Sequence, residues 1–321
     1  MKYIIRCWLF TLSFNLAAQN DSPNALFVQL EPGVTLEVVD WGGEGQPILF
    51  LAGLGNTAHV YDNFAHHFTD HYKVYGLTRR GYGASSQPKY GYDIPTLAQD
   101  IKGVLDSLGI SKISLIGHSI AGDELTEFAR KYPERVDKLI YLDAAYDRSN
   151  FVDLMQKAPY PPQAQPIMSA ADSSSSLQVS AYLSRIFGMD YPESEVLATR
   201  VFGSEGKLEG AVTPDRIGIK IILGLQPPAY QEVKSPALGI FAVFNHVNEL
   251  FPNYEIFDHN NKLMAHQAME VLRPYLLDQI QIFMDQVPNG QVVQFSGADH
   301  FIFLTHEREV VAEMLKFLDK P

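Results

Sequence analysis

The sequence predicts an α/β fold in which helices cover both faces of a doubly wound, mostly parallel β-sheet. Short apolar runs alternate along most of the chain with longer segments whose apolar residues recur at helical spacing. Strands that are connected through helices form right-handed crossovers, which place neighbouring strands parallel. The alternation stops at residues 148–233 and then resumes, so we expect one core with a long insertion.

The expected elements of the core follow this alternation in order. Before the insertion, we expect strands at 35–41 (TLEVVDW), 47–51 (PILFL), 72–77 (YKVYGL), 112–116 (KISLI) and 138–143 (KLIYLD). The helices expected in the same part are 58–70, 94–108 and 120–131. After the insertion, we expect strands at 236–243 and 291–295, a second helical insertion at about 260–285, and a last helix at 306–318.

The interruption of this pattern predicts the domain organisation. Residues 148–233 contain eight prolines and mix helical with irregular segments. A long insertion between two strands of an α/β sheet is typical of a lid over one edge. We therefore expect a core formed by residues 24–147 and 234–321 and a helical cap formed by residues 148–233.

The N-terminus has the features of a signal peptide, which we expect at residues 1–18. A positively charged start (MKYIIR) precedes an apolar stretch (CWLFTLSFNLA) that is too short to span a bilayer, and Ala17 and Ala18 offer a cleavage site. The alternative is a buried or disordered N-terminal segment. The protein is thus expected to be exported, to the periplasm or outside the cell. Because Cys7 is the only cysteine, the processed chain would contain no disulfide and no thiol nucleophile.

Size and charge narrow the classes of partner. The chain has 321 residues, a net charge of −12, a pI of about 5.2 and 46% hydrophobic residues, as an ordinary globular protein does. No basic surplus exists to neutralise phosphates, which argues against a nucleic-acid partner. We expect a small-molecule substrate and no membrane-spanning segment, while the oligomeric state cannot be read from the sequence.

A serine lies on the connection between an expected strand and an expected helix, at residues 116–122 (IGHSIAG). A nucleophile on such a turn needs strained backbone and small neighbours, which Gly117 and Ala121 supply around Ser119. The alternative is that Ser119 caps an ordinary helix. Glu124 follows in the first turns of that helix, and we expect its charge to stabilise the helix start rather than to act near the site.

These residues resemble the α/β-hydrolase superfamily, and the resemblance covers about 24–147 and 234–321. It implies the fold predicted above, with residues 148–233 as the family's variable cap after the sixth strand of the fold. In relatives that open epoxides or carbon–halogen bonds, an aspartate occupies the position of Ser119. The resemblance therefore implies acyl transfer by a serine.

Two further loops carry the resemblance. Residues 52–55 (AGLG) follow a strand where the family has its oxyanion loop, which assigns the oxyanion hole to the backbone N–H groups of Leu54 and Ile120. Ala52 stands where the family usually has histidine, which places the usual hydrogen bonding of this loop in question. Residues 80–85 (RGYGAS) match the family's D-x-R-G-x-G-x-S loop without its Asp, and we expect a structural role for them.

The resemblance places the general base in the loop after the last strand. Residues 297–301 (GADHF) have the family's G-x-x-H setting, which assigns the base to His300 among ten histidines. His118, beside the serine, is expected to pack or to line the pocket, and His306 is expected to cap the last helix.

The acid that orients His300 is not settled by the sequence. The family's usual position, after strand 236–243, is Asn245, which cannot carry a negative charge. We favour Asp143, at the end of strand 138–143, where some branches of the superfamily have their acid. The alternatives are Glu249, which could reach back from a loop, and Asp147.

The expected function is therefore that of a serine hydrolase that cleaves an ester-type bond of a small or medium, partly apolar substrate through an acyl-enzyme. No metal or cofactor is expected, because no H-E-x-x-H, EF-hand, Walker or dinucleotide motif is present. Two alternatives stay open. The first is a lyase or a C–C hydrolase on the same scaffold. The second is a ligand-binding protein that kept the fold without turnover, which the departures at Ala52 and Asn245 suggest.

Overall fold

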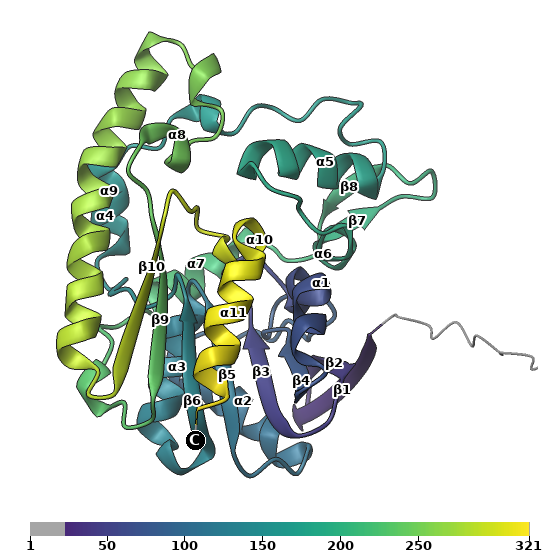
Figure 1. Cartoon of the computed structure of the whole chain (residues 1–321). Helices are drawn as coiled ribbons and strands as arrows, with labels where there is room; N and C mark the ends of the chain where they lie inside the picture. The colour runs from purple at the N-terminus through teal and green to yellow at the C-terminus, as the bar shows by residue number, and fades with distance from the viewer. Residues whose placement is uncertain (1–22, 321) are drawn as a thin grey trace, which may run out of the picture.

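A central eight-stranded sheet organises the computed structural model, which describes residues 23–320 (Figure 1). The expected signal peptide at 1–18, with Cys7, lies outside the described residues. The strands lie in the order β1-β2-β4-β3-β5-β6-β9-β10. The strand β2 runs antiparallel to both of its neighbours, and all pairs without β2 are parallel. The strands are β1 (Asn24–Glu31), β2 (Val34–Gly42), β3 (Gln46–Leu51), β4 (Tyr72–Leu77), β5 (Ile113–His118), β6 (Val136–Leu142), β9 (Ala237–Val243) and β10 (Gly290–Ser296). The predicted mostly parallel α/β sheet is confirmed.

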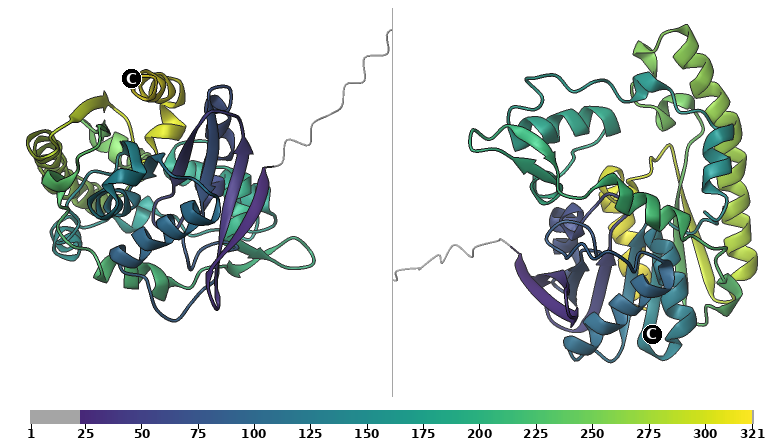
Figure 2. Two further views of the ribbon diagram at one scale, coloured as in Figure 1. Left: turned by 90° about the horizontal axis from the view of Figure 1, so that it is seen from below. Right: turned by 180° about the vertical axis from the view of Figure 1, so that it is seen from behind.

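Helices and short 3₁₀ turns, labelled η, connect these strands. Those of the core are η1 (Ala58–Tyr61), α1 (Asp62–Ala65), η2 (His66–Phe68), α2 (Ile94–Ser107), α3 (Ala121–Lys131), η3 (Pro133–Arg135), α8 (Val247–Leu250), η6 (Tyr254–Ile256), α9 (His259–Gln286), α10 (Ile302–Thr305) and α11 (Glu307–Leu318). Most lie on one or the other face of the sheet (Figure 2).

Both faces of the sheet are apolar because both are covered. In β3, Leu49 and Leu51 pack with residues of α2, α3 and α9, whereas Ile48 and Phe50 pack with residues of η1, α1 and α11. Successive side chains of a strand point to opposite faces, so a sheet that is covered twice needs apolar residues at every position. This explains why the core strands appear in the sequence as continuous apolar runs.

Two expectations for the core differ from the structure. The expected helix 58–70 is divided into η1, α1 and η2, which nevertheless bury Val60, Phe64 and Phe68 on one side. Strand β1 was not expected. Only Val28 of its eight residues is fully buried, because β1 lies at the edge of the sheet, while Leu26 and Leu30 on the same face are partly buried. The exposed Phe27 interrupts the alternation of apolar and polar residues, which hides the strand in the sequence.

Between β6 and β9 the chain leaves the sheet and forms the insertion, which contains the expected cap 148–233. Its elements are α4 (Phe151–Lys157), η4 (Pro162–Ala164), α5 (Ser176–Phe187), α6 (Glu193–Thr199), β7 (Arg200–Phe202), β8 (Leu208–Ala211), α7 (Asp215–Leu223) and η5 (Tyr230–Glu232). Figure 1 shows α5, α6, β7 and β8 beyond the carboxyl ends of the central strands. The expected helical cap with irregular segments also contains a short sheet that was not expected, because β7 and β8 pair antiparallel. Strands of three and four residues are too short to produce a visible alternation.

Helix α9, the expected second helical insertion at 260–285, connects the insertion with the sheet. Its first half buries Ala265 in a small apolar cluster with Ala158 of the insertion. Its second half buries Phe283 against the sheet, and Pro274 lies between these two parts. Within the part of the chain that the structure describes, no helix has the length and apolar character needed to cross a bilayer.

The start of α3 packs directly on the segment after β6. Arg148 donates from Nη1 to Asp123 Oδ2 and to the carbonyl oxygen of Ala144, both at 3.0 Å. A Cβ atom on Gly122 would lie 2.2 Å from that same carbonyl oxygen of Ala144. Glycine at position 122 therefore sets how closely the helix after Ser119 approaches the segment after Asp143.

Gly122→Ala is expected to lower the free energy of unfolding by about 1–3 kcal/mol, because the added methyl group forces two backbone segments apart. Urea unfolding measures this loss. Gly210→Ala is the matched control, since a Cβ atom there would meet nothing within 4 Å, and its stability is expected to stay unchanged. Equal losses in both variants would contradict the steric explanation.

Candidate active site

The residues selected from the sequence gather at the carboxyl edge of the parallel strands. Leu54 follows β3 and Ser119 follows β5. Asp143 follows β6, and His300 lies in the loop after β10. Parallel strands all end at the same edge, and the crevice outside this edge is where open α/β sheets bind their ligands. The topology thus brings four loops that are distant in sequence to one place.

Ser119 lies on a strained turn between β5 and α3. Its φ is 55°, a region that few non-glycine residues adopt. Its N–H donates to the carbonyl oxygen of Leu142 (3.2 Å), so pairing with β6 continues into the turn. A Cβ atom on Gly117 would lie 2.7 Å from Leu125 Cδ1, which explains the glycine. Ser119 does not cap α3, because the N-cap residue is Ile120 and makes no side-chain cap bond.

His300 lies between Ser119 and Asp143. Its Nε2 is 2.9 Å from Ser119 Oγ, and its Nδ1 is 2.6 Å from Asp143 Oδ2. When Nδ1–H donates to the carboxylate, Nε2 is free to accept the proton of the serine hydroxyl. The side chain of Asp143 is 7% exposed, so its charge acts on the imidazole with little screening by water. This arrangement can take a proton from the serine and stabilise the imidazolium that results.

Three hydrogen bonds besides the one with His300 hold the side chain and the backbone of Asp143. Its own N–H donates to the carbonyl oxygen of Ile240 (2.7 Å), and the N–H of Ala242 donates to Oδ1 (3.0 Å). The hydroxyl of Tyr146 also donates to Oδ1. Burial and the negative charge of Asp143 raise the pKa of Tyr146 far above its usual value, so the hydroxyl keeps its proton. Sequence reasoning missed Tyr146, because no motif marks it.

The two alternative acids have other partners. Glu249 accepts hydrogen bonds from two backbone N–H groups at the start of α8, at 2.5 and 3.2 Å. Asp147 accepts hydrogen bonds from the N–H and the hydroxyl of Ser149, at 2.9 and 2.6 Å. Among the interactions of the described residues, neither carboxylate contacts His300, so the geometry favours Asp143.

His118 packs beneath the loop that carries His300. It is 1% exposed, and its Nε2 lies 2.8 Å from the carbonyl oxygen of His300. Burial lowers the pKa of His118 well below its usual value, so the ring is neutral and Nε2–H donates to that oxygen. The expectation for His306 is wrong, because it occupies the N-cap position of α11 without a side-chain cap bond.

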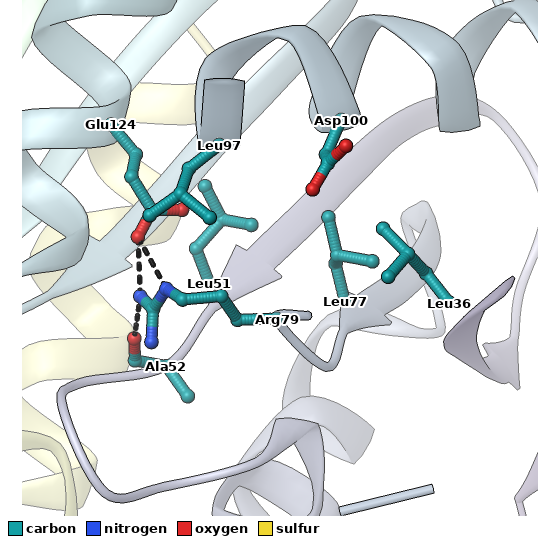
Figure 3. A pocket seen from close by; sticks show the side chains of 8 residues that line it. All are labelled: Leu36, Leu51, Ala52, Leu77, Arg79, Leu97, Asp100 and Glu124. Atoms are coloured by element: carbon teal, nitrogen blue, oxygen red, sulfur yellow. Dashed lines mark hydrogen bonds and ion pairs between the residues drawn. The ribbon is translucent and has the colours of Figure 1, made fainter. Parts of the chain in front are cut away.

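A buried ion pair fixes the loop that carries Leu54. Arg79 Nε and Nη2 lie 2.6 and 2.5 Å from Glu124 Oε1, and these side chains are 5% and 3% exposed (Figure 3). The same guanidinium donates to the carbonyl oxygens of Ala52 (2.8 Å) and Gly53 (3.3 Å). The expectation for Glu124 is wrong, because it is buried and paired near the site. Sequence reasoning also missed Arg79, which holds the loop that lacks the family's usual histidine.

A cavity of about 470 Å³ opens over Ser119, and we call it the Ser119 cavity. Leu54 and Ile120 line it, and neither backbone N–H has an acceptor among residues 23–320. Its walls come from the core and the insertion and are mainly aliphatic and aromatic, as shown by Phe151, Leu154, Phe187, Ile222, Leu225 and Phe301. Such walls suit a partly apolar ligand. The described residues contain no cluster of three or more side chains suited to hold a metal ion.

Comparison with known proteins agrees with this architecture. The sequence model of the alpha/beta hydrolase fold matches residues 46–173. The crystal structure of E-2-(acetamidomethylene)succinate hydrolase matches 93% of this chain and 100% of that one, with a TM-score of 0.68 and 19% identity. This chain has the α/β-hydrolase fold. A carboxylesterase from Bacillus subtilis also matches, with a TM-score of 0.57, 16% identity and coverage of 93% and 92%.

Curated relatives match a shorter part of the chain. A non-heme chloroperoxidase of Streptomyces lividans is 35% identical over 120 residues, which are 36% of this chain and 44% of that protein. Epoxide hydrolase 1 of Caenorhabditis elegans is 33% identical over 131 residues, which are 38% of this chain and 32% of that protein. The matches thus span less than half of these relatives. Their names describe different reactions, so the fold alone does not define the chemistry.

A further buried carboxylate, that of Glu195, connects the insertion with the loop after β3. Glu195 of α6 is 0% exposed and accepts hydrogen bonds from Asn56 Nδ2 (3.0 Å), Thr57 N–H (3.0 Å) and Thr57 Oγ1 (2.5 Å). Burial raises the pKa of Glu195 to about 7, although these donors lower it. Sequence reasoning missed Glu195, because a glutamate in a helix usually faces water.

Breaking the ion pair between Arg79 and Glu124 is expected to destabilise the folded protein. Arg79→Leu leaves Glu124 buried without a cation and is expected to lower the free energy of unfolding by about 3–5 kcal/mol. Adding Glu124→Leu removes the stranded charge, so the double variant is expected to be more stable than the sum of the single losses. Urea unfolding of all four proteins measures this coupling. The same cycle on the exposed pair Lys316–Glu313 is expected to give less than about 1 kcal/mol, and equal couplings would contradict the prediction.

Stability is expected to depend on pH through Glu195. Between pH about 4.5 and about 7, the folded protein keeps a proton on Glu195 that the unfolded chain has lost. The unfolding free energy of the wild type therefore falls as pH rises through this window, by on the order of 3 kcal/mol from this group. Glu195→Gln cannot ionise, so its stability relative to wild type is expected to rise over the same window. Urea unfolding across this range tests the difference, with Glu205→Gln as an exposed control that follows the wild type.

Proposed function

We propose that this protein is a serine hydrolase that cleaves an ester-type bond of a small or medium, partly apolar substrate. The observation that carries the proposal is the line of contacts from Ser119 Oγ through the His300 imidazole to Asp143 Oδ2, at 2.9 and 2.6 Å. The positive φ of Ser119 supports it, because strain of this kind gathers at reactive residues. The apolar walls of the Ser119 cavity support the choice of substrate.

The reaction follows from the roles that these atoms can take. His300 Nε2 accepts the hydroxyl proton of Ser119 while Oγ bonds to the substrate carbonyl carbon. The N–H groups of Leu54 and Ile120 stabilise the resulting oxyanion, and Asp143 stabilises the imidazolium. His300 then gives its proton to the leaving oxygen as the C–O bond breaks.

In the second half of the reaction, water attacks the acyl-enzyme in the way that Ser119 attacked the substrate. His300 takes a proton from the water as its oxygen bonds to the acyl carbon. Collapse of the second oxyanion releases the acid, and His300 returns the proton to Ser119 Oγ. No further reactant is needed, because atoms and charges balance over the two halves.

Replacing the proposed nucleophile and acid is expected to remove activity. Ser119→Ala should abolish hydrolysis of p-nitrophenyl butyrate, and Asp143→Asn should lower kcat by about 10⁴-fold, because the imidazole loses its orienting anion. The matched change Asp147→Asn and the change Glu249→Gln are expected to leave kcat near the wild-type value. Steady-state kinetics and circular dichroism of the purified variants test both activity and folding.

A covalent label separates this enzyme from a ligand-binding protein without turnover. A fluorophosphonate probe is expected to modify Ser119 in the wild type and to leave Ser119→Ala unmodified. If the folded wild type neither turns over esters nor takes up the label, the serine hydrolase proposal is wrong. If it takes up the label without hydrolysing any ester, the reaction belongs to another class on the same scaffold.

A further inference from the structure

A second apolar cavity adjoins the Ser119 cavity. It has a volume of about 410 Å³ and lies between α4 and α7, and we call it the α4–α7 groove. It is lined by Phe151, Val152, Met155 and Gln156 of α4 and by Ile219, Ile222 and Leu223 of α7. Phe151, Met155 and Ile222 line both cavities. These three side chains therefore form a shared wall between the groove and the space over Ser119.

The chemistry of the α4–α7 groove suits an apolar occupant. Gln156 is the one polar residue of its lining, and none of the lining residues carries a charge. Val152, Ile219 and Leu223 are nevertheless 51%, 55% and 72% exposed. Exposed apolar surface of this kind is stabilised when an apolar group covers it, and a bound phosphate or carboxylate would find no cation here.

The position of the groove indicates which part of a substrate it receives. Ile222 of α7 and Leu54 pack against the same apolar cluster, which also contains Ile120, so α7 lies on the side of the proposed oxyanion hole. Helix α5 packs instead beside the proposed base, where Phe187 and Phe301 have ring centroids 5.3 Å apart. Because His300 gives its proton to the leaving group, the leaving group lies on the α5 side. The acyl part then extends towards α7.

We propose that the α4–α7 groove binds the distal part of a medium or long straight acyl chain whose carbonyl group Ser119 attacks. This proposal rests on the proposed ester hydrolysis and names its substrate class. The chain passes between Phe151, Met155 and Ile222 and covers the exposed residues of the groove. Each methylene buried there is worth about fourfold in kcat/KM, so the enzyme selects its substrates by chain length.

The test compares p-nitrophenyl butyrate, octanoate and dodecanoate below their aggregation concentrations. The wild-type kcat/KM is expected to rise by at least about tenfold from butyrate to dodecanoate. Leu223→Glu places a charge in the outer groove and is expected to lower the dodecanoate-to-butyrate ratio by at least about tenfold. Leu177→Glu makes the same change at a residue that is 60% exposed on α5, outside the lining of both cavities, and is expected to keep the ratio.

Three results would overturn the proposal. The first is a dodecanoate-to-butyrate ratio that Leu223→Glu leaves unchanged. The second is a preference for dodecanoate that arises only above its aggregation concentration, which would assign the groove to a lipid surface. The third is a dimer in sedimentation that Leu223→Glu dissociates, which would assign the groove to a second copy of the chain.

A binding measurement distinguishes failure of this proposal from failure of the proposed function. Calorimetric titration of the Ser119→Ala protein with dodecanoate and butyrate needs no turnover. If no ester is hydrolysed but dodecanoate binds at least about tenfold more tightly, and Leu223→Glu removes this difference, the groove binds acyl chains and ester hydrolysis is wrong. If butyrate esters are hydrolysed but both acids bind equally, ester hydrolysis stands and the acyl-chain groove is wrong.

Discussion

The buried ion pair between Arg79 and Glu124 is the interaction on which the arrangement of the site depends. One guanidinium connects α3, the helix that follows Ser119, with the two carbonyl groups that precede Leu54. Desolvation of two charges offsets much of their attraction, so the pair explains little of the stability of the folded state. The pair contributes to the geometry of the site instead, because the planar guanidinium group holds several acceptors at fixed relative positions. Arg79 thus fixes the helix that follows Ser119 and the loop that carries Leu54 relative to each other.

Two further arginines near the site form buried ion pairs of the same kind. Arg80 pairs with Asp100 of α2, and Arg148 pairs with Asp123 of α3, at 2.5 and 3.0 Å. Each arginine comes from a loop at the carboxyl edge of the sheet, and each acid comes from a helix behind it. Loops at this edge have no strand pairing to hold them, so charge-assisted hydrogen bonds to helices supply their order. The walls of the Ser119 cavity can then stay mostly apolar.

The sequence was informative where a physical pattern repeats. The apolar run 112–116 and the small residues near Ser119 predicted both a strand and the turn after it, because they satisfy backbone constraints that extend over several residues. In the edge strand β1, Leu26, Val28 and Leu30 face the core, but the exposed Phe27 interrupts the alternation that would reveal the strand. The choice between Asp143 and Glu249 depended on how two loops meet in space, which no local pattern encodes. Tyr146 was undetectable for the same reason.

Glu195 restricts which insertions the core of this protein can accept. The insertion leaves the sheet after β6 and returns at β9, so another segment could in principle take its place between these strands. Here the replaced segment would have to bring an acceptor for the side chains of Asn56 and Thr57, which belong to the core. A chimera without such an acceptor would bury an amide and a hydroxyl without partners. The core therefore accepts only an insertion that brings a matching acceptor for these two side chains.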